Sequence, residues 1–183
     1  MVIKKRSRKK NNERTISQFD FIMEFLPTFS GTFLDFGAGS CHATTYSREV
    51  YSIEKNIVVD ISSRTQNICN RLGYDFYDYK QFAGLKNINF FFASHSVEHV
   101  NSLQNFMESL IKILSKNAYV FIEVPYLKNE SDLENHTHAP HTYYFNKYSL
   151  IKIFKQYGIE LLTSHSIFYI EETSVIRGLF KKS

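Results

Sequence analysis

Residues Leu34 to Thr44 read LDFGAGSCHAT, and the expected fold follows from the pattern of this segment. An apolar run, TFLDF, comes directly before its glycines, and the helix-like segment CHATTYSREVYSI follows them. A short strand that turns through small residues into a helix is typical of nucleotide-binding α/β domains, whose ligands lie beyond the carboxyl ends of the strands. The stretch therefore predicts a nucleotide site and leaves open which nucleotide binds there.

Strand-like and helix-like segments alternate along the first 125 residues. Nearly unbroken apolar strands suit a parallel sheet that is covered on both faces. We predict an α/β domain with a Rossmann-like, doubly wound, mostly parallel seven-stranded sheet and helices on both faces. The expected helices are residues 15–27, 41–53, 62–73, 102–114 and 147–158, and the expected strands are residues 31–36, 56–62, 74–79, 87–94, 118–125, 159–170 and 173–180.

The glycine turn disfavours a dinucleotide. The dinucleotide fingerprint is G-x-G-x-x-G, whose last glycine lets helix and strand pack closely, but His42 stands at that position after Gly37 and Gly39. Asp35, just before the turn, would sit poorly beside a pyrophosphate. No G-K-S/T follows, which excludes a phosphate-binding P-loop.

A cationic ligand that carries a free amino acid group fits the turn better. Asp35 could face the ammonium, and the glycine backbone would allow close approach. Asp60 follows a buried strand in VVDIS and can accept both hydroxyls of a ribose. Glu54 is the alternative for the ribose, although the strand-like VVD favours Asp60.

Five segments in this order and spacing resemble the motifs of class I S-adenosylmethionine-dependent methyltransferases: LDFGAGS, VVDIS, FYDY, FFFASHSVEHV and LSKNAYVFIEVP. HTYYFNKYSLIKIFKQYGIELL is similar to a C-terminal stretch common in the branch that acts on small molecules. The resemblance covers about residues 30 to 165 and implies S-adenosyl-L-methionine as cofactor. It implies cofactor contacts at Asp35, Gly37, Ala38, Gly39, Asp60, Ile61, Asp78, Tyr79 and Ser94.

The sequence departs from the family pattern at a few positions. Cys41 stands where many members have a third glycine, Asn89 replaces the acid that often opens the fourth-strand motif, and Asn117 with Ala118 replaces a Gly-Gly turn. We expect cofactor binding to survive these changes. They keep open the alternative of a non-catalytic binding protein on a methyltransferase fold.

Histidines suggest the chemistry. Methyl transfer is an in-line displacement that needs alignment, and a hydroxyl acceptor also needs a base, for which imidazole suits neutral pH. We expect the irregular stretch 126–145 to close over a small polar acceptor, such as a sugar, with His141 or His95 as the base. For His99 we expect a structural hydrogen bond.

A metal site is the alternative for the histidines of this loop. His136, His138 and His141 form H-x-H-x-x-H beside Glu134 and Asp132, a set that could hold zinc or a harder divalent ion. Loop histidines at this spacing more often form hydrogen bonds or contact substrate. We therefore predict no metal.

The positive charge is concentrated at the N-terminus. The net charge is +4, yet residues 1–14 hold seven Lys or Arg and one Glu, a balance of +6. We predict a basic, flexible tail over residues 1–15 and a single domain over residues 16–183. Such a tail could bind nucleic acid, so an RNA methyltransferase is an alternative. It is not favoured, because no N/D-P-P-Y motif follows the fourth strand and no Pro-Cys nucleophile is present.

The remaining features point to a cytoplasmic protein. The two cysteines lack CxxC spacing, the first residues lack the apolar stretch of a signal peptide, and no apolar run is long enough to span a membrane. The expected partner is a small-molecule methyl acceptor. Nothing in the sequence specifies an oligomeric state.

Overall fold

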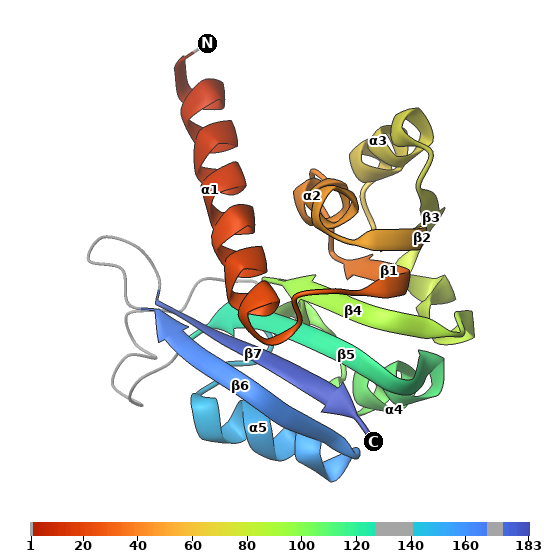
Figure 1. Ribbon diagram of the computed structural model, residues 1–183, viewed down its shortest axis with the longest axis vertical. Helices are drawn as coiled ribbons and strands as arrows, with labels where there is room; N and C mark the ends of the chain where they lie inside the picture. The colour runs from red at the N-terminus through yellow and green to blue at the C-terminus, as the bar shows by residue number, and fades with distance from the viewer. Residues whose placement is uncertain (1, 127–140, 168–173) are drawn as a thin grey trace.

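A computed structural model describes residues 2–126, 141–167 and 174–183. Its strands form one sheet of order β3-β2-β1-β4-β5-β7-β6 (Figure 1). The strands are β1 (Ser30–Phe36), β2 (Ser52–Val59), β3 (Asp75–Tyr77), β4 (Ile88–Ser94), β5 (Leu114–Pro125), β6 (Ile159–Ile167) and β7 (Val175–Lys182). The helices are α1 (Val2–Phe25), α2 (His42–Val50), α3 (Ser63–Leu72), α4 (Leu103–Ile113) and α5 (Lys147–Gln156), with 3₁₀ turns η1 (Tyr79–Gly84) and η2 (Val97–His99).

The predicted fold class is confirmed. The neighbours β3-β2, β2-β1, β1-β4 and β4-β5 are parallel, whereas β7 runs antiparallel to both β5 and β6. The antiparallel hairpin at the edge makes the sheet mostly rather than fully parallel.

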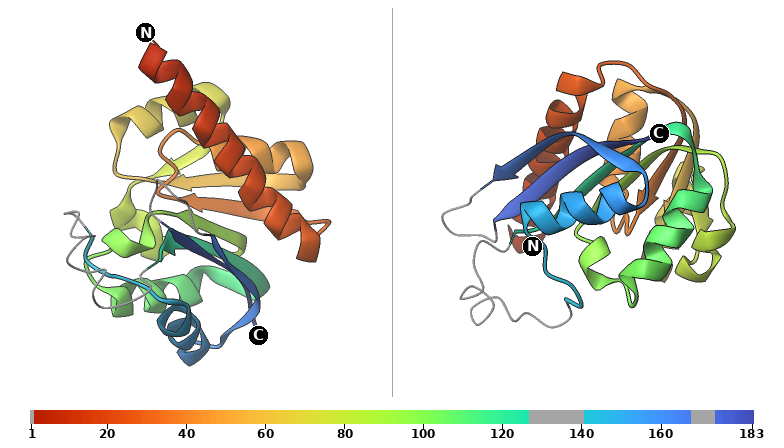
Figure 2. Two further views of the ribbon diagram at one scale, coloured as in Figure 1. Left: turned by 90° about the vertical axis from the view of Figure 1, so that its left-hand side faces the viewer. Right: turned by 90° about the horizontal axis from the view of Figure 1, so that it is seen from below.

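Helices cover both faces of the sheet. In Figures 1 and 2, α1, α2 and α3 lie over one face, and α4 and α5 lie over the other. Alternate side chains of β1 explain this arrangement, because successive residues of a strand point to opposite faces. Phe33 packs with Phe19 of α1, whereas Leu34 and Phe36 belong to the core that includes Phe106 of α4.

The N-terminal segment differs from the prediction. Helix α1 runs without a break from Val2 to Phe25, so the residues expected to form a flexible tail continue a helix. Lys and Arg have high helix propensity, and the helix is anchored further along by Phe19 and Ile22, both fully buried. An anchored helix extends easily through such residues, because propagation costs much less than nucleation.

Element boundaries also shift near α2. The helix expected over residues 41–53 ends at Val50, because Tyr51 is extended and its hydroxyl donates a hydrogen bond of 2.7 Å to the Leu26 carbonyl. The chain then enters β2 at Ser52. No helix within the described ranges combines the length and apolarity needed to cross a membrane.

Candidate cofactor and acceptor site

The glycine turn after β1 has a left-handed backbone. Gly37 and Gly39 have φ of +73° and +52°, and the Gly37 N–H donates to the Val59 carbonyl at 2.8 Å. A Cβ on Gly37 would lie 2.6 Å from both Cβ and Oγ of Ser96, whereas a Cβ on Gly39 would meet nothing within 4 Å. At Gly37 the left-handed backbone and the lack of room for a Cβ beside Ser96 both require glycine. At Gly39 only the left-handed backbone favours glycine.

Cys41 lies behind the turn. It has φ of +57°, which explains why a glycine is common at this position, and its side chain is fully buried. It packs with Val58, Cys69 and Tyr74, and its Sγ lies 3.8 Å from Cys69 Sγ. The Cys41 side chain therefore fits within the core, and it does not line the cavity described below.

Asp60 joins the turns that follow β1 and β2. Its Oδ2 accepts the Gly39 N–H at 2.9 Å, and its Oδ1 accepts the Ser62 N–H at 2.8 Å. Each carboxylate oxygen has a second lone pair, which leaves acceptor capacity for a ribose. The neighbouring Ile61 side chain is 83% exposed, an apolar surface beside the carboxylate. Glu54 lies in the first half of β2, near the opposite edge of the sheet, which disfavours it for the ribose.

Asp35 is buried beneath the turn. Its Oδ2 accepts from Thr44 twice, from Oγ1 at 2.7 Å and from the backbone N–H at 3.2 Å, and so holds the first turn of α2. Burial raises the pKa of Asp35 to about 7, although the hydrogen bonds from Thr44 oppose this rise. The carboxyl group lines the cavity, where an ammonium would favour its ionised form.

Asp78 and Tyr79 lie at the end of β3. The Asp78 side chain accepts the Lys80 N–H at 2.9 Å, and the Asp78 N–H donates to the Gln81 side chain at 2.8 Å, a reciprocal capping box for η1. The Tyr79 ring packs against Phe36 with centroids 5.7 Å apart. Asp60 N–H donates to the Tyr77 carbonyl, so this turn lies beside the proposed ribose position.

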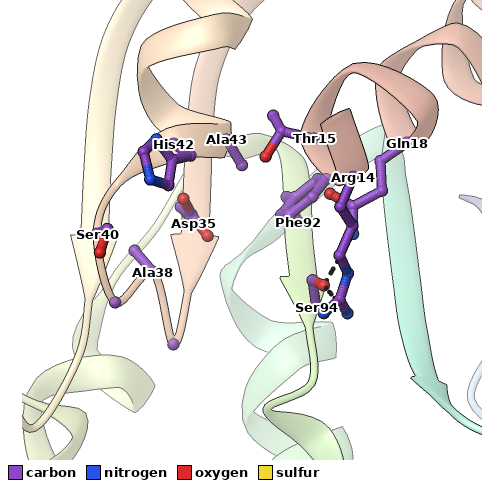
Figure 3. Close-up of a pocket in the computed structure, with 12 residues that line it drawn as sticks. Arg14, Thr15, Gln18, Asp35, Ala38, Ser40, His42, Ala43, Phe92 and Ser94 are labelled. Atoms are coloured by element: carbon purple, nitrogen blue, oxygen red, sulfur yellow. Dashed lines mark hydrogen bonds between the residues drawn. The ribbon is translucent and has the colours of Figure 1, made fainter. Parts of the chain in front are cut away.

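A cavity of about 280 Å³ opens between α1, α2 and the carboxyl ends of β1 and β4 (Figure 3). Arg14, Thr15 and Gln18 of α1 form one side. Sequence reasoning missed all three, because they lie within or beside the segment interpreted as a tail. The other lining residues are Asp35, Gly37, Ala38, Gly39, Ser40, His42, Ala43, Phe92 and Ser94.

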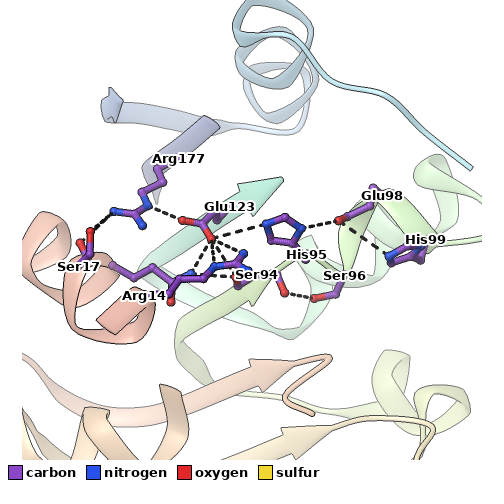
Figure 4. Close-up of polar contacts among 10 residues, drawn as sticks. Arg14, Ser17, Ser94, His95, Ser96, Glu98, His99, Glu123 and Arg177 are labelled. Carbon is purple, nitrogen blue, oxygen red and sulfur yellow. Dashed lines mark hydrogen bonds and ion pairs between the residues drawn. The ribbon is translucent and has the colours of Figure 1, made fainter. Parts of the chain in front are cut away.

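Ser94 connects this cavity to a buried charge cluster around Glu123 (Figure 4). Its Oγ accepts from Arg14 Nη2 at 3.0 Å and from Gln18 Nε2 at 2.9 Å, and donates to Glu123 Oε1 at 3.2 Å. Arg177, 1% exposed, donates from Nε to the other carboxylate oxygen of Glu123. Burial opposes the ionisation of Glu123, but Arg14 and Arg177 prevail and hold its pKa below the usual value.

His95 lies between two glutamates. It has φ of +52°, its Nε2 is 3.8 Å from Glu123 Oε1, and its Nδ1 is 3.5 Å from Glu98 Oε1. Burial, together with the nearby Arg14, lowers the pKa of His95 to about 4. The ring is therefore neutral at pH 7, and its approach to Glu98 is no ion pair.

Glu98 is deeply buried in η2. Its side chain is 1% exposed, and neither carboxylate oxygen has a hydrogen-bond partner. Burial raises the pKa of Glu98 to about 7. Its backbone carbonyl accepts the N–H groups of Thr142 and Tyr143 at 2.9 and 3.0 Å, so the residues after 140 dock on η2.

The structure thus brings both predicted bases to one place. The His141 and His99 rings lie with centroids 4.8 Å apart, and the ligand atoms of Glu98, His99 and His141 all lie within 4.8 Å of one another. Of the predicted H-x-H-x-x-H cluster, His136 and His138, with Glu134 and Asp132, fall outside the described residues.

The other departures lie away from this site. Asn89 Oδ1 accepts the Thr32 N–H at 3.0 Å, near the start of β4. Asn117 has φ of +62° within the first residues of β5 and so supplies the left-handed conformation that a glycine would otherwise provide. Both positions are remote from the carboxyl ends of the strands.

Solved structures share the fold. A complex between the Haloferax volcanii Trm112 methyltransferase activator and a putative methyltransferase matches with a TM-score of 0.75 and 13% identity, over 94% of this chain and 92% of that one. A SAM-dependent methyltransferase from Archaeoglobus fulgidus matches with a TM-score of 0.71 and 16% identity, over 96% of this chain and 94% of that one. A Thermotoga maritima protein, described as a possible histamine N-methyltransferase, matches with a TM-score of 0.72 and 16% identity, over 99% of this chain and 96% of that one.

Sequence comparison assigns the family. No curated protein sequence matches the chain. Residues 8–164, which are most of the chain, match the family described as "Methyltransferase domain". The chain therefore belongs to the methyltransferase-domain family of class I enzymes, whose cofactor is S-adenosyl-L-methionine.

Proposed function

We propose that the protein transfers a methyl group from S-adenosyl-L-methionine to a hydroxyl of a small polar molecule such as a sugar. The observation that carries this proposal is the contact between the glycine turn and Asp60 at the carboxyl ends of β1 and β2, beside the cavity at the carboxyl ends of β1 and β4. A carboxylate with spare acceptor capacity thus lies next to an open cavity with polar lining, an arrangement that suits a nucleoside joined to an amino acid.

The residues around this contact fit the cofactor. Asp60 would accept the ribose hydroxyls, and the exposed Ile61, with Asp78 and Tyr79, would flank the adenine. Gly37, Ala38 and Gly39 would allow the methionine end to approach the backbone. Asp35 would face its ammonium, and Arg14 lines the same cavity, where it could meet the carboxylate. When bound, the cofactor supplies a methyl group on a positively charged sulfur.

His95 is the base that we favour over His141. It follows Ser94 directly at the end of β4, and its neutral ring can accept a proton at pH 7. Its Nε2 is buried and lacks a hydrogen-bond partner, so an acceptor would have to reach the ring from the side of Nδ1. A pKa of about 4 makes it a weak base, and the acceptor hydroxyl then needs additional acidification.

Calorimetry with S-adenosyl-L-methionine tests the cofactor site. We expect binding to the full chain, and an affinity loss of about 10- to 100-fold on Asp60→Ala, which removes acceptors for two hydroxyls. Glu54→Ala is the matched control, since Glu54 is an exposed acid of β2, the strand that Asp60 follows. Absence of binding to the wild type would favour the non-catalytic alternative.

Labelled methyl transfer to a panel of sugars, other alcohols, amines and RNA tests the acceptor. We expect transfer to a hydroxyl compound and a lower kcat for His95→Ala with unchanged affinity for the cofactor. Transfer to amines alone would contradict O-methylation. Equal turnover by wild type and His95→Ala would refute the assignment of the base.

A reducing, cytoplasmic setting is part of the proposal. Cys41 and Cys69 are both free, and their Sγ atoms are 3.8 Å apart, well beyond a disulfide bond of about 2.05 Å. Reduced thiols so close together are typical of a reducing compartment.

A further inference from the structure

We propose that Glu98, His99 and His141 form a binding site for a divalent transition-metal ion, with Zn²⁺ as the best match to the donor set. Glu98 and His99 come from η2, and His141 comes from the segment that docks on it. The cluster shares only His141 with the H-x-H-x-x-H pattern of the sequence.

The Glu98 carboxylate carries the argument. It is 1% exposed, and both of its oxygens lack a hydrogen-bond partner. A buried polar group without a partner is costly, and a buried charge is costlier still, unless it is paired or coordinates a metal. Two histidine nitrogens lie beside Glu98 Oε1, at 3.5 Å (His95 Nδ1) and 3.9 Å (His99 Nε2), and both distances are too long for strong hydrogen bonds.

The geometry suits a small cation. The ligand atoms of the three residues lie within 4.8 Å of one another. In a tetrahedral site with bonds of about 2.0–2.2 Å, ligand atoms are separated by roughly 3.3–3.6 Å. His99 is 37% exposed and His141 is half-buried, so modest rotation of these rings would close the site.

The donor set decides the class of ion. Two imidazoles and one carboxylate match catalytic zinc sites, which keep a further position open. Imidazole nitrogens are poor ligands for Mg²⁺ and Ca²⁺, which prefer oxygen. The positive charge of Arg14 also acts on Glu98, but its guanidinium is already paired with Glu123. It therefore does not neutralise the carboxylate that the cation would use.

The location connects the cation to the reaction. Ser96, two residues before Glu98, donates from Oγ to the Phe36 carbonyl at 2.7 Å and packs against Gly37 of the glycine turn. Figure 4 shows Glu98 and His99 beside His95, which follows the cavity residue Ser94, so the proposed ion would lie next to the cofactor site. In this respect the inference rests on the proposed function, because an acceptor hydroxyl near the cation would lose its proton more easily. The O–H bond would break, its electron pair would stay on oxygen, and the proton would pass to the base named in the proposed function.

Metal titration tests the site directly. The full chain, freed of metal with a chelator, is titrated with Co²⁺ by visible absorption and with Zn²⁺ by calorimetry. We expect one equivalent to bind, with affinity more than about 100-fold lower in Glu98→Gln, His99→Ala and His141→Ala, beyond the effect typical of outer-shell partners. His165→Ala is the matched control, since His165 is exposed on β6.

The outcomes separate this inference from the proposed function. Wild type that binds S-adenosyl-L-methionine but neither metal overturns the metal site and leaves the methyltransferase proposal standing. Metal binding that survives in all three ligand variants also overturns it, because the ion then sits elsewhere. If Glu98→Gln fails to fold, metal binding by the His99→Ala variant decides the question, because the His99 side chain is partly exposed and its loss should not prevent folding. If the wild type binds the metal, the three variants lose this binding, and S-adenosyl-L-methionine does not bind, the metal site is supported and the proposed function is refuted.

Activity provides a further readout. Once an acceptor is found, removal of metal from the wild type should abolish methyl transfer and leave cofactor affinity unchanged, and one equivalent of Zn²⁺ should restore it. Full activity in the metal-free protein would refute the role of the cation in acidifying the acceptor.

Discussion

Arg14 of α1 reaches Glu123 of β5, with Arg14 Nε 2.7 Å from Glu123 Oε1, and so connects the N-terminal helix to the centre of the sheet. Gln18 donates to the same oxygen at 2.7 Å, and Arg177 holds the other oxygen. A carboxylate with no exposed surface is thereby stabilised by two arginines from opposite ends of the chain. The N-terminal helix is consequently part of the site and of the fold.

Replacement of these residues should affect stability unequally. Arg14→Ala removes one of several donors to Glu123 and should lower the free energy of unfolding by about 1–3 kcal/mol, measured by urea denaturation. Glu123→Ala leaves Arg177 buried without its carboxylate and should cost about 3–5 kcal/mol. Asp20→Ala, at an exposed position of the same helix, is the control. Equal losses for Arg14→Ala and Asp20→Ala would show that the Arg14 contact contributes nothing.

Deletion of residues 1–10 tests the RNA alternative without disturbing the site. A longer deletion would remove Arg14 and confuse two effects. The shorter one removes six of the seven basic residues of the segment 1–14. For a small-molecule enzyme we expect cofactor affinity and turnover to stay within about twofold, since the described contacts around Glu123 come from Arg14 and from residues after it. A large, salt-sensitive loss of RNA binding, measured by filter binding, would instead favour the nucleic-acid acceptor.

Gly37→Ala should be much more damaging than Gly39→Ala. Both changes place a side chain in left-handed backbone, which costs about 1 kcal/mol, but only the Cβ on Gly37 would clash with Ser96. We expect thermal denaturation to show a loss of about 2–4 kcal/mol for Gly37→Ala and about 1 kcal/mol for Gly39→Ala. In a Ser96→Gly background the loss from Gly37→Ala should shrink. Additive losses in this double-mutant cycle would contradict the clash.

The sequence predicts those parts of the candidate site that lie on one strand and the turn after it. Asp35, Asp60, Asp78 and Ser94 all follow or end parallel strands, whose carboxyl ends meet at one edge of the sheet. Glu123 and Arg177 also left a signal, since each is a single charge within an apolar strand. Their pairing follows from the antiparallel register of β5 and β7, which neither strand's own sequence reveals.

Other parts depend on docking between distant segments and leave no local signal. Arg14 belongs to a run of basic residues that resembles a solvated tail, and only the position of α1 across the sheet brings it to Ser94. Glu98 is an ordinary polar residue in ASHSVEHV. It becomes buried in the fold, where Thr142 and Tyr143 dock on the backbone of η2. Such contacts are set by tertiary packing, which short-range pattern does not encode.

Asp35 should make the stability of the protein depend on pH. Its pKa is about 7 in the folded state and near 3.8 when exposed, so between these values the folded state holds a proton that the unfolded state has lost. Stability relative to Asp35→Asn should therefore fall as pH rises from 4 to 7, by roughly 4 kcal/mol, and level off above 7. Denaturation curves of both proteins across this range measure it. Asp75→Asn, at a half-exposed aspartate, is the control, and parallel curves for wild type and Asp35→Asn would contradict the shift.

The same carboxyl group should make cofactor affinity depend on pH. If Asp35 pairs with the ammonium of S-adenosyl-L-methionine, only its ionised form binds well, and below pH 7 that form must be generated at the expense of binding free energy. Affinity should then rise from pH 5.5 to 7 by up to about tenfold for each pH unit, while the α-amino group, with a pKa of about 7.7–8.0, stays protonated. Calorimetry on wild type and Asp35→Asn measures this slope, which should vanish in the variant. A slope that persists in Asp35→Asn would show that another group pairs with the ammonium.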